Sequence, residues 1–273
     1  LYDRLEIIEL ESYTPYEKQQ IALRHLIPRQ LARNGLDAGM LKIQPAAVRE
    51  LIQEYTAESG VRALDRQIGV LCRKVAKVYL QKAGKVTITA KNLSDYLGKP
   101  QHLDTQLPAE ACVGVAIGLA WTAAGGTTLP VEASAMEGGG NLELTGQLGE
   151  VMKESARTAI SHIRSMAPAL GIDPAFYKTK DIHVHFPEGA VPKDGPSAGV
   201  TMLTAVISAL SGIPVRSDVA MTGEITLHGK VLPIGGLKEK TMAALRHGMH
   251  TVIIPAENEK DLEEIDQTVR QAL

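Results

Sequence analysis

The apolar side chains of this 273-residue chain change their spacing near residue 99, and this change limits what the chain can fold into. Before it they recur every three or four residues, which is typical of amphipathic helices. After residue 111, short apolar runs alternate with helical stretches, which is typical of a mixed α/β region. The segment between them, KPQHLDTQLPAEA, has two prolines and no clear period. We therefore predict a helical domain over 1–98, a linker over 99–111 and an α+β domain over 112–273.

The first part reads as helical, with clear start and stop signals. The stretch TPYEKQQIALRHLIPRQLARNG begins with Thr14 as N-cap, Pro15 at the first helical position and Glu17 three residues on, and it ends at Gly35. The stretch QPAAVRELIQEYTAESG ends in the same way at Gly60, and VRALDRQIGVLCRKVAKVYLQKAG keeps its apolar residues on one helical face. A short strand, KVTIT, and a small helix, AKNLSDYLG, are predicted to follow.

The second part alternates predicted strands and helices. The strands are CVGVAIGLAWT and TTLPVEASAM, separated by two glycines, then DIHVHF, segments of DVAMTGEITLHGKVLPIGG, and TVIIP. The helices are LGEVMKESARTAISHIRSMAPALG, the run over 198–211, and LKEKTMAALRHG. An apolar fraction of 44% with only 4% aromatic residues predicts a core of Val, Leu, Ile and Ala.

The composition argues against several classes of partner and site. With 29 basic and 31 acidic residues and a net charge of −2, the chain offers no electrostatic reason to bind nucleic acid or an anionic membrane. Cys72 and Cys112 are its only cysteines, so neither a disulfide framework nor a Cys-rich zinc site is expected. A reduced, cytosol-like compartment fits best. The beginning LYDRLEIIEL lacks Met, which predicts a piece of a larger protein.

Ser197, in the loop VPKDGPSAGV, has two interpretations that its local pattern leaves open. Serine is a good N-cap, and it could cap the helix over 198–211. Alternatively, Gly195 and Pro196 force a sharp turn, and the small Ala198 and Gly199 leave the hydroxyl approachable as a nucleophile. Backbone N–H groups at the start of the helix would then stabilise an oxyanion.

A nucleophilic serine needs a base, and the sequence offers histidine and lysine candidates. His183 and His185 in DIHVHF face the same side of a strand, and Asp194 stands close to the serine. Lys238 and Lys240 lie in GGLKEK, where burial would lower the pKa of an amine and let it accept a proton. Hydrogen-bonded sheet residues are the alternative for the histidines. No metal site is predicted, because no cluster such as H-E-x-x-H supplies further ligands.

Several long motifs resemble the Lon family of ATP-dependent proteases. PKDGPSAG, MTGEITLHGKVLPIGGLKEK and HVHFPEGA resemble its proteolytic domain, and GLAWT, LTGQLGEVMKES and IPAENEKDLEEI extend the resemblance over nearly all of 112–266. LYDRLEII, YTPYEK, IALRHLIPRQ and SGVRALDRQIGVLCRKVAK resemble the helical lid of the AAA+ module in that family. The resemblance therefore covers almost the whole chain and implies a helical lid followed by a Ser–Lys peptidase domain.

The resemblance implies roles for individual residues. Ser197 matches the nucleophile of the family, and Lys240, the second lysine of GGLKEK, matches its general base. Thr222 in MTGE matches a threonine that holds the amine by a hydrogen bond, with a strand-end cap as the alternative. Asp194 matches a residue associated with gating of the site, with a turn-capping aspartate as the alternative. Lys238 falls outside the dyad.

Other positions are expected to play supporting parts. Glu132, Glu224, His183 and His185 are expected to surround the site, with hydrogen bonding within the sheet as the alternative reading. Trp121, the only tryptophan, is expected in the peptide groove or, equally, in the core.

In the helical part, Arg62 matches the sensor-2 arginine that reaches nucleotide phosphate, and Arg4 lies where an arginine finger is expected. Surface salt bridges are the alternative for both. The motif G-x-x-x-x-G-K-[ST] is missing from the sequence, so ATP hydrolysis is not expected in this chain. ATP and Mg²⁺ are expected to act in the full-length protein only, and peptide cleavage is expected to need no cofactor.

The resemblance implies a serine endopeptidase that cleaves unfolded or damaged proteins and assembles as a hexameric ring. It also implies the cytoplasm of a bacterium, or the mitochondrial matrix of a eukaryote. Two alternatives stay open at this point. One is a Ser–His–Asp hydrolase that uses His185 and Asp194, and the other is an assembly or nucleotide-sensing module with a dormant site.

Overall fold

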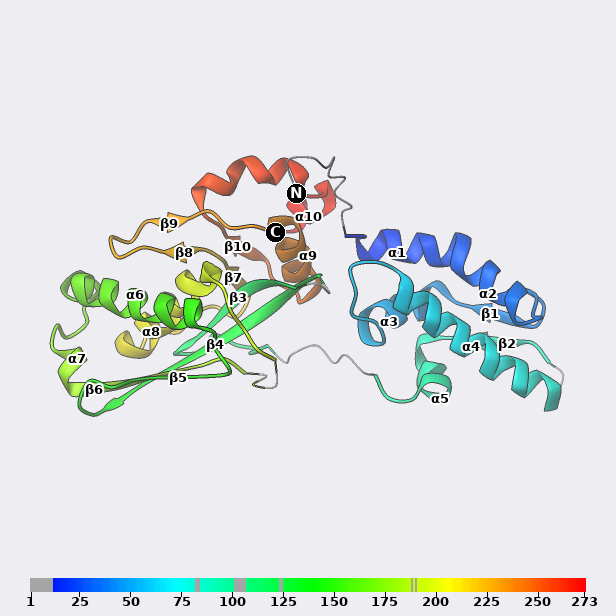
Figure 1. Cartoon of the computed structure of the whole chain (residues 1–273), viewed down its shortest axis with the longest axis horizontal. Coiled ribbons are helices and arrows are strands. Elements are labelled where there is room, and N and C mark those ends of the chain that lie inside the picture. Colours follow the sequence, from blue (N-terminus) through cyan, green and yellow to red (C-terminus); the bar gives the residue numbers. More distant parts are fainter. Residues whose placement is uncertain (1–11, 82–83, 101–106, 123–124, 188, 190) are drawn as a thin grey trace, which may run out of the picture. The chain divides into compact units, whose positions relative to one another are not determined.

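A computed structural model of the chain describes residues 12–81, 84–100, 107–122, 125–187, 189 and 191–273 (Figure 1). Apart from the short segment 123–125, the chain divides into two compact units, residues 1–104 and 105–273. The first unit is mainly helical and the second combines a mixed sheet with helices, which confirms the predicted fold class. In the described part of the chain, no helix is long and apolar enough to cross a membrane.

The first unit begins with one helical stretch that changes its hydrogen bonding in the middle. It consists of α1 (Pro15–Ile21), a π-helical turn η2 (Ala22–Leu26) and α2 (Ile27–Arg33). Thr14 and Glu17 form the predicted capping box at its start. Pro28 lacks an N–H, and its ring conflicts with the carbonyl of residue 24, so the turn before it widens and Ile27 N donates five residues back to Ala22 O.

The rest of the first unit packs two more helices over a small parallel sheet. Its elements are β1 (Leu41–Ile43), α3 (Pro45–Glu54), α4 (Arg62–Gln81), β2 (Val86–Ile88), η3 (Ala90–Asn92) and α5 (Leu93–Leu97). Helix α3 ends before the predicted Gly60, because the Thr56 hydroxyl donates to the carbonyls of Leu51 and Ile52 and terminates it. Leu51, Ile68 and Ile88 are fully buried in the core of this unit.

The second unit is organised around a mixed sheet. Within the described residues, six strands follow the order β10-β7-β3-β4-β6-β5. The bounds are β3 (Val115–Thr122), β4 (Gly125–Glu137), β5 (Leu142–Thr145), β6 (Lys180–His185), β7 (Val219–Met221) and β10 (Thr251–Ile253). Strand β7 is parallel to β3 and β10, β5 is parallel to β6, and β4 is antiparallel to β6. A separate hairpin joins β8 (Glu224–Ile225) to β9 (Val231–Leu232).

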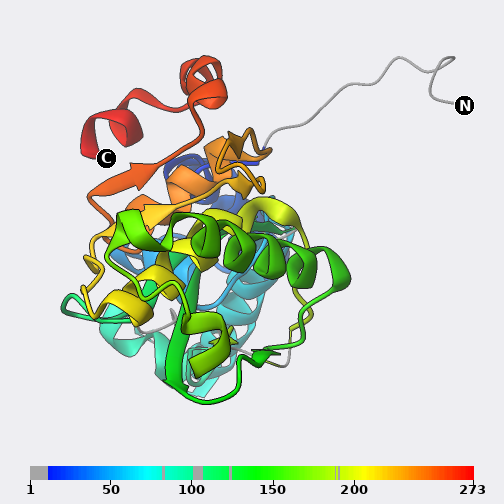
Figure 2. The same cartoon turned by 90° about the vertical axis from the view of Figure 1, so that its left-hand side faces the viewer.

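Helices cover both faces of the central strand β3 (Figures 1 and 2). The helical elements are α6 (Glu150–Met166), η4 (Ala167–Leu170), α7 (Phe176–Thr179), η5 (Pro196–Ala198), α8 (Gly199–Ser211), α9 (Leu237–Arg246), η6 (Ala256–Glu264) and α10 (Gln267–Ala272). Helices α6 and α8 pack together in the larger core, which buries Ile163, Met202 and Phe186. Helix α9 packs on β3 beside Ile117 and Ala244. Strand β3 therefore contacts both α8 and α9, and also the turn η5 that precedes α8.

Candidate active site

Ser197 lies in the 3₁₀ turn η5, between a sharp bend and helix α8. Gly195 has a φ of 127°, which favours glycine and turns the chain just before the serine. The N-cap of α8 is Ala198, and no side chain in the described part of the chain caps this helix, so the capping interpretation of Ser197 is wrong. The Ser197 carbonyl accepts hydrogen bonds from Gly223 N at 2.8 Å and from the Thr222 hydroxyl at 3.4 Å.

Lys240 is buried on the first turns of α9. The residue is 3% exposed, and its Nζ donates to Thr222 Oγ1 at 3.1 Å. Burial penalises the charged amine and lowers the pKa of Lys240 from 10.5 to about 8. Thr222 is itself 1% exposed and donates its own proton to the Ser197 carbonyl, so one threonine connects the lysine to the serine backbone. A substantial fraction of this amine is neutral near pH 8.

Ser197 and Lys240 line the same cavity, which has a volume of about 370 Å³. Its described walls are Trp121, Pro196, Ser197, Pro233, Ile234, Gly235, Gly236, Glu239 and Lys240. Apart from the serine, the lysine and the glutamate, these walls are apolar or backbone. No hydrogen bond joins the Ser197 hydroxyl to Lys240 Nζ among the described residues, and catalytic hydrogen bonds often tighten only when substrate binds.

Asp194 fastens the loop before Ser197 to the start of α6. Its Oδ1 accepts from Met152 N in the first turn of that helix at 3.2 Å and from Gly195 N at 2.9 Å. Lys193 and Gly149 join the same two segments through the bond from Gly149 N to Lys193 O, at 2.7 Å. A negative carboxylate at a helix N-terminus is electrostatically favoured. The structure thus places Asp194 between the loop before Ser197 and the N-terminal end of α6.

His183 and His185 lie on the face of the sheet opposite the larger core, because their neighbours on β6 point into that core. The Thr145 hydroxyl contacts His183 Nε2 at 2.8 Å and His185 Nδ1 at 2.7 Å. Glu132 is exposed and stands opposite His185 in the β4–β6 register. Among the residues that the structure describes, no hydrogen bond links either histidine to Ser197, and no His, Cys, Asp and Glu group could hold a metal ion.

Trp121 stands at the end of β3 in the cavity wall and is 59% exposed, so it is not a core residue. Glu224 begins β8, two residues after Thr222, and is half-buried outside the cavity lining. Sequence reasoning missed Gly126 and Gly236. A side chain at Gly126 would overlap the Glu239 carbonyl, and Gly236 begins α9 with a φ of 68°. The glycine pairs at 125–126 and 235–236 were the sequence signal that could have indicated these close backbone approaches.

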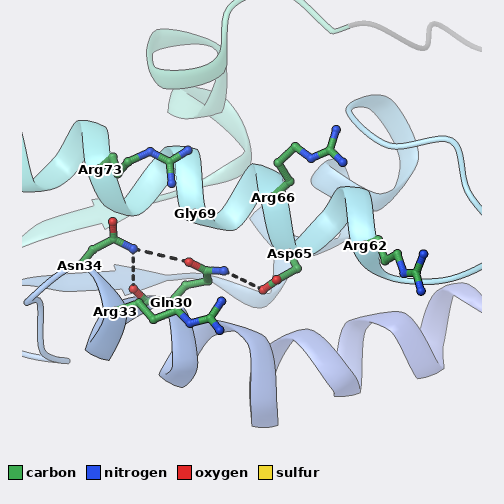
Figure 3. A pocket seen from close by; sticks show the side chains of 8 residues that line it. All are labelled: Gln30, Arg33, Asn34, Arg62, Asp65, Arg66, Gly69 and Arg73. Carbon is green, nitrogen blue, oxygen red and sulfur yellow. Dashed lines mark hydrogen bonds between the residues drawn. The ribbon is translucent and has the colours of Figure 1, made fainter.

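Arg62 lies in a second, strongly basic pocket within the first unit (Figure 3). This pocket has a volume of about 400 Å³ and is lined by Gln30, Arg33, Asn34, Arg62, Asp65, Arg66, Gly69 and Arg73. Burial alone would raise the pKa of Asp65, but hydrogen bonds from Gln30 and Arg29 and nearby arginine charges lower it overall. Arg62 is the first residue of α4, and Arg4 lies outside the described residues.

Comparison with known proteins identifies the family of the chain. The family model of the Lon protease (S16) C-terminal proteolytic domain matches residues 87–273, and that of the Lon protease AAA+ ATPase lid domain matches residues 32–88. Over its whole length, the chain is 56% identical to the Lon protease of Bacillus thuringiensis and 51% identical to Lon protease 1 of Bacillus subtilis and to the Lon protease of Haemophilus influenzae. It covers 34%, 35% and 34% of these relatives, about a third of their length. The chain therefore belongs to the Lon protease family, as the resemblance predicts, with a lid domain followed by a proteolytic domain.

Proposed function

We propose that this chain is a serine endopeptidase in which Ser197 and Lys240 form a catalytic dyad. The observation that carries the proposal is the buried amine of Lys240, held by Thr222 in the cavity that Ser197 also lines. A lysine in water is protonated at neutral pH and cannot accept a proton. Burial lowers the pKa of Lys240 to about 8, which suits a general base.

The dyad would work through an acyl-enzyme. Neutral Lys240 takes the proton from the Ser197 hydroxyl while the serine oxygen attacks the carbonyl carbon of a peptide bond. The positive end of α8, which begins two residues after Ser197, favours the negative charge that develops on the carbonyl oxygen. Lys240 then passes the proton to the leaving amine. Neutral Lys240 next takes a proton from water as the water oxygen attacks the acyl carbon. It returns that proton to the Ser197 oxygen when the bond between the serine and the acyl group breaks and the second product leaves.

The geometry does not favour the Ser–His–Asp alternative. Among the described residues, His185 hydrogen-bonds to Thr145, and Asp194 accepts from Met152 N and Gly195 N, so neither is bonded to the other or to the Ser197 hydroxyl. We expect His185→Ala to keep kcat/KM for a short fluorogenic peptide within about threefold of the parent, since distant sites contribute little to a local barrier. The assay is run without ATP on folded protein. A loss comparable to that of Ser197→Ala would instead identify His185 as the base.

The pH dependence of cleavage should follow the amine. Because only neutral Lys240 accepts a proton, kcat/KM is expected to rise with pH through an inflection near 8 and to level off above it. The measurement is kcat/KM for the same peptide from pH 6 to pH 10, with thermal unfolding recorded at each pH. A profile that levels off by pH 7 would contradict this assignment and point to an imidazole base.

Thr222 is expected to hold the amine in place. Thr222→Val keeps the shape of the side chain but removes the acceptor for Lys240 and the donor to the Ser197 carbonyl, so kcat should fall about tenfold to a hundredfold. Thr222→Ser restores both bonds and serves as the matched control. The proposed hydroxyl bridge is contradicted if the valine and serine variants have equal kcat values.

The wider activity of the family is also proposed for the full-length protein. There the lid would contribute Arg62 to nucleotide phosphate and Arg4 to a neighbouring subunit, with ATP and Mg²⁺ bound by parts outside this chain. The arginine-rich pocket around Arg62 supports an anionic ligand. Substrates would be unfolded or damaged proteins, the assembly a hexameric ring and the location the bacterial cytoplasm. The chain itself would cleave peptides without a cofactor.

A dormant module is the second candidate, and light scattering combined with the peptide assay separates the two. A ring-sized, folded assembly that cleaves the peptide supports the endopeptidase. The same assembly without cleavage supports a module whose site is held closed around Asp194.

A further inference from the structure

Trp121 is a large apolar side chain left largely open to solvent at the catalytic cavity. Single exposed apolar residues are normal on protein surfaces. This one, however, lines the same cavity as Ser197 and Lys240, at the end of the central strand β3. Strand β3 also packs directly against α9, the helix that carries Lys240. Trp121 is therefore connected to the candidate site both through the cavity wall and through the strand that carries it.

The side chain of Trp121 lies against the backbone at the start of α9. A Cβ atom built on Gly236 would stand 3.1 Å from Cγ of Trp121 and 3.2 Å from its Cβ. Gly236 therefore gives the indole room through both its missing side chain and its φ of 68°. The Cβ, Cγ and Cδ1 atoms of Trp121 therefore lie close to Gly236, just before the first turn of the helix.

Lys240 stands one helical turn after Gly236, and its N–H donates to the Gly236 carbonyl at 3.0 Å. Residues four apart lie on the same face of a helix, and helical side chains lean back over the preceding turn. Helix geometry therefore leans the stem of Lys240 back toward Gly236, the residue beside Trp121. Lys240 and Trp121 are therefore both next to Gly236 in the wall of the same cavity.

We propose that Trp121 is a positioning residue that closes the solvent side of the cavity over the Lys240 amine and keeps water away from it. This inference rests on the proposed Ser–Lys dyad. It gives Trp121 a part in catalysis through Lys240, separate from any contact that the indole makes with substrate.

The charged groups near Lys240 do not offer another explanation for its state. Among the described residues of the cavity wall, Glu239 is the only other ionisable group, and on β8 Glu224 stands outside the wall. Lys238, on the same helix, acts electrostatically on Asp266. The lowered pKa of Lys240 has burial as its cause, with no contribution from these charges. Removing the cover should therefore change the ionisation of the amine.

The test compares pH profiles of kcat/KM for Trp121→Ala, Trp121→Phe and the control Leu227→Ala. Leu227 has the same 59% exposure and lies outside the cavity wall. In Trp121→Ala we expect the inflection to move up by about one pH unit, so that activity falls roughly tenfold at pH 7 and recovers by pH 10. Phenylalanine should restore most of the parent profile, and Leu227→Ala should match the parent.

A second readout follows the amine without activity. In protein with ¹³C-labelled lysine side chains, the NMR signal of Lys240, assigned by its loss in Lys240→Met, should titrate at higher pH in Trp121→Ala than in the parent. The inference would be overturned if, in Trp121→Ala, neither the inflection of the kcat/KM profile nor the NMR titration of Lys240 moves. This holds even if the variant has a higher KM or a lower activity at every pH. Failure of the dyad itself would appear differently, as full activity in Lys240→Met.

Discussion

Replacing Lys240 by methionine is expected to abolish peptide hydrolysis and, at neutral pH, to make the protein more stable. Methionine fills nearly the same volume but has no amine to accept the Ser197 proton, so kcat should fall by about 10³-fold or more. The gain in stability follows from the buried amine. The pKa of Lys240 is about 8 in the folded protein and 10.5 in the unfolded chain, so folding below pH 8 carries a cost of about 3 kcal/mol.

The sign of this effect gives the prediction a definite pH window. Between pH 8 and pH 10.5 the unfolded chain binds a proton that the folded protein does not, so the stability of the parent rises with pH through this range. The advantage of Lys240→Met should thus be greatest below pH 8 and vanish above 10.5. Urea unfolding of the parent and of Lys240→Met at pH 7 and pH 10 measures the difference in stability, and the peptide assay measures the loss of activity. A variant that is inactive because it is misfolded would be less stable at both values.

Replacing Gly126 by alanine is expected to cost both activity and stability. A methyl group at this position would overlap the backbone carbonyl of Glu239, the residue before Lys240, and would press on Ala243. This overlap is costly to relieve, because the obstructing atom is a backbone carbonyl and not the end of a flexible side chain. Arg246 also donates from α9 to the Gly126 carbonyl at 3.2 Å. We expect a loss of about 3 kcal/mol in the free energy of unfolding and displacement of the Lys240 amine.

Gly139→Ala is the matched control for Gly126→Ala. Gly139 lies in the turn after β4, where the nearest neighbour of an added Cβ is the Asn141 amide at 4.0 Å and the backbone is not left-handed. The control should unfold within about 0.5 kcal/mol of the parent and keep its activity. Equal stabilities for the two variants in urea unfolding would contradict the proposed contact between β4 and α9.

Much of the fold follows from periodicity and from start and stop residues. The capping box at Thr14 and Glu17, the helix after Ser197 and the strand holding His183 lie where their patterns predict. Strands β1 and β5 were not predicted, because their three and four residues, LKI and LELT, stand beside predicted helices or turns and alternate too briefly to be separated from them. The two glycines that were expected to separate two strands are instead the first residues of β4. Gly126 lies there against the Glu239 carbonyl of α9, where only a residue without a side chain fits.

The site was less accessible to local reasoning than the fold. The pattern around Ser197 could not separate a helix cap from a nucleophile, and the structure decides against the cap. Lys238 and Lys240 share one short motif, and only tertiary packing against Thr222 buries one amine and not the other. Trp121 had no sequence signal for cavity or core, because a residue at the end of a strand can face either.

The central claim is that Ser197 is a nucleophile activated by Lys240, and trapping the acyl-enzyme tests it most directly. The folded chain is mixed at pH 8 with a peptidyl ester that deacylates slowly, quenched in acid and mapped by mass spectrometry. We predict a single acyl adduct on Ser197, absent in Ser197→Ala and formed far more slowly in Lys240→Met. An adduct on another residue, or formation at the parent rate in Lys240→Met, would contradict the dyad.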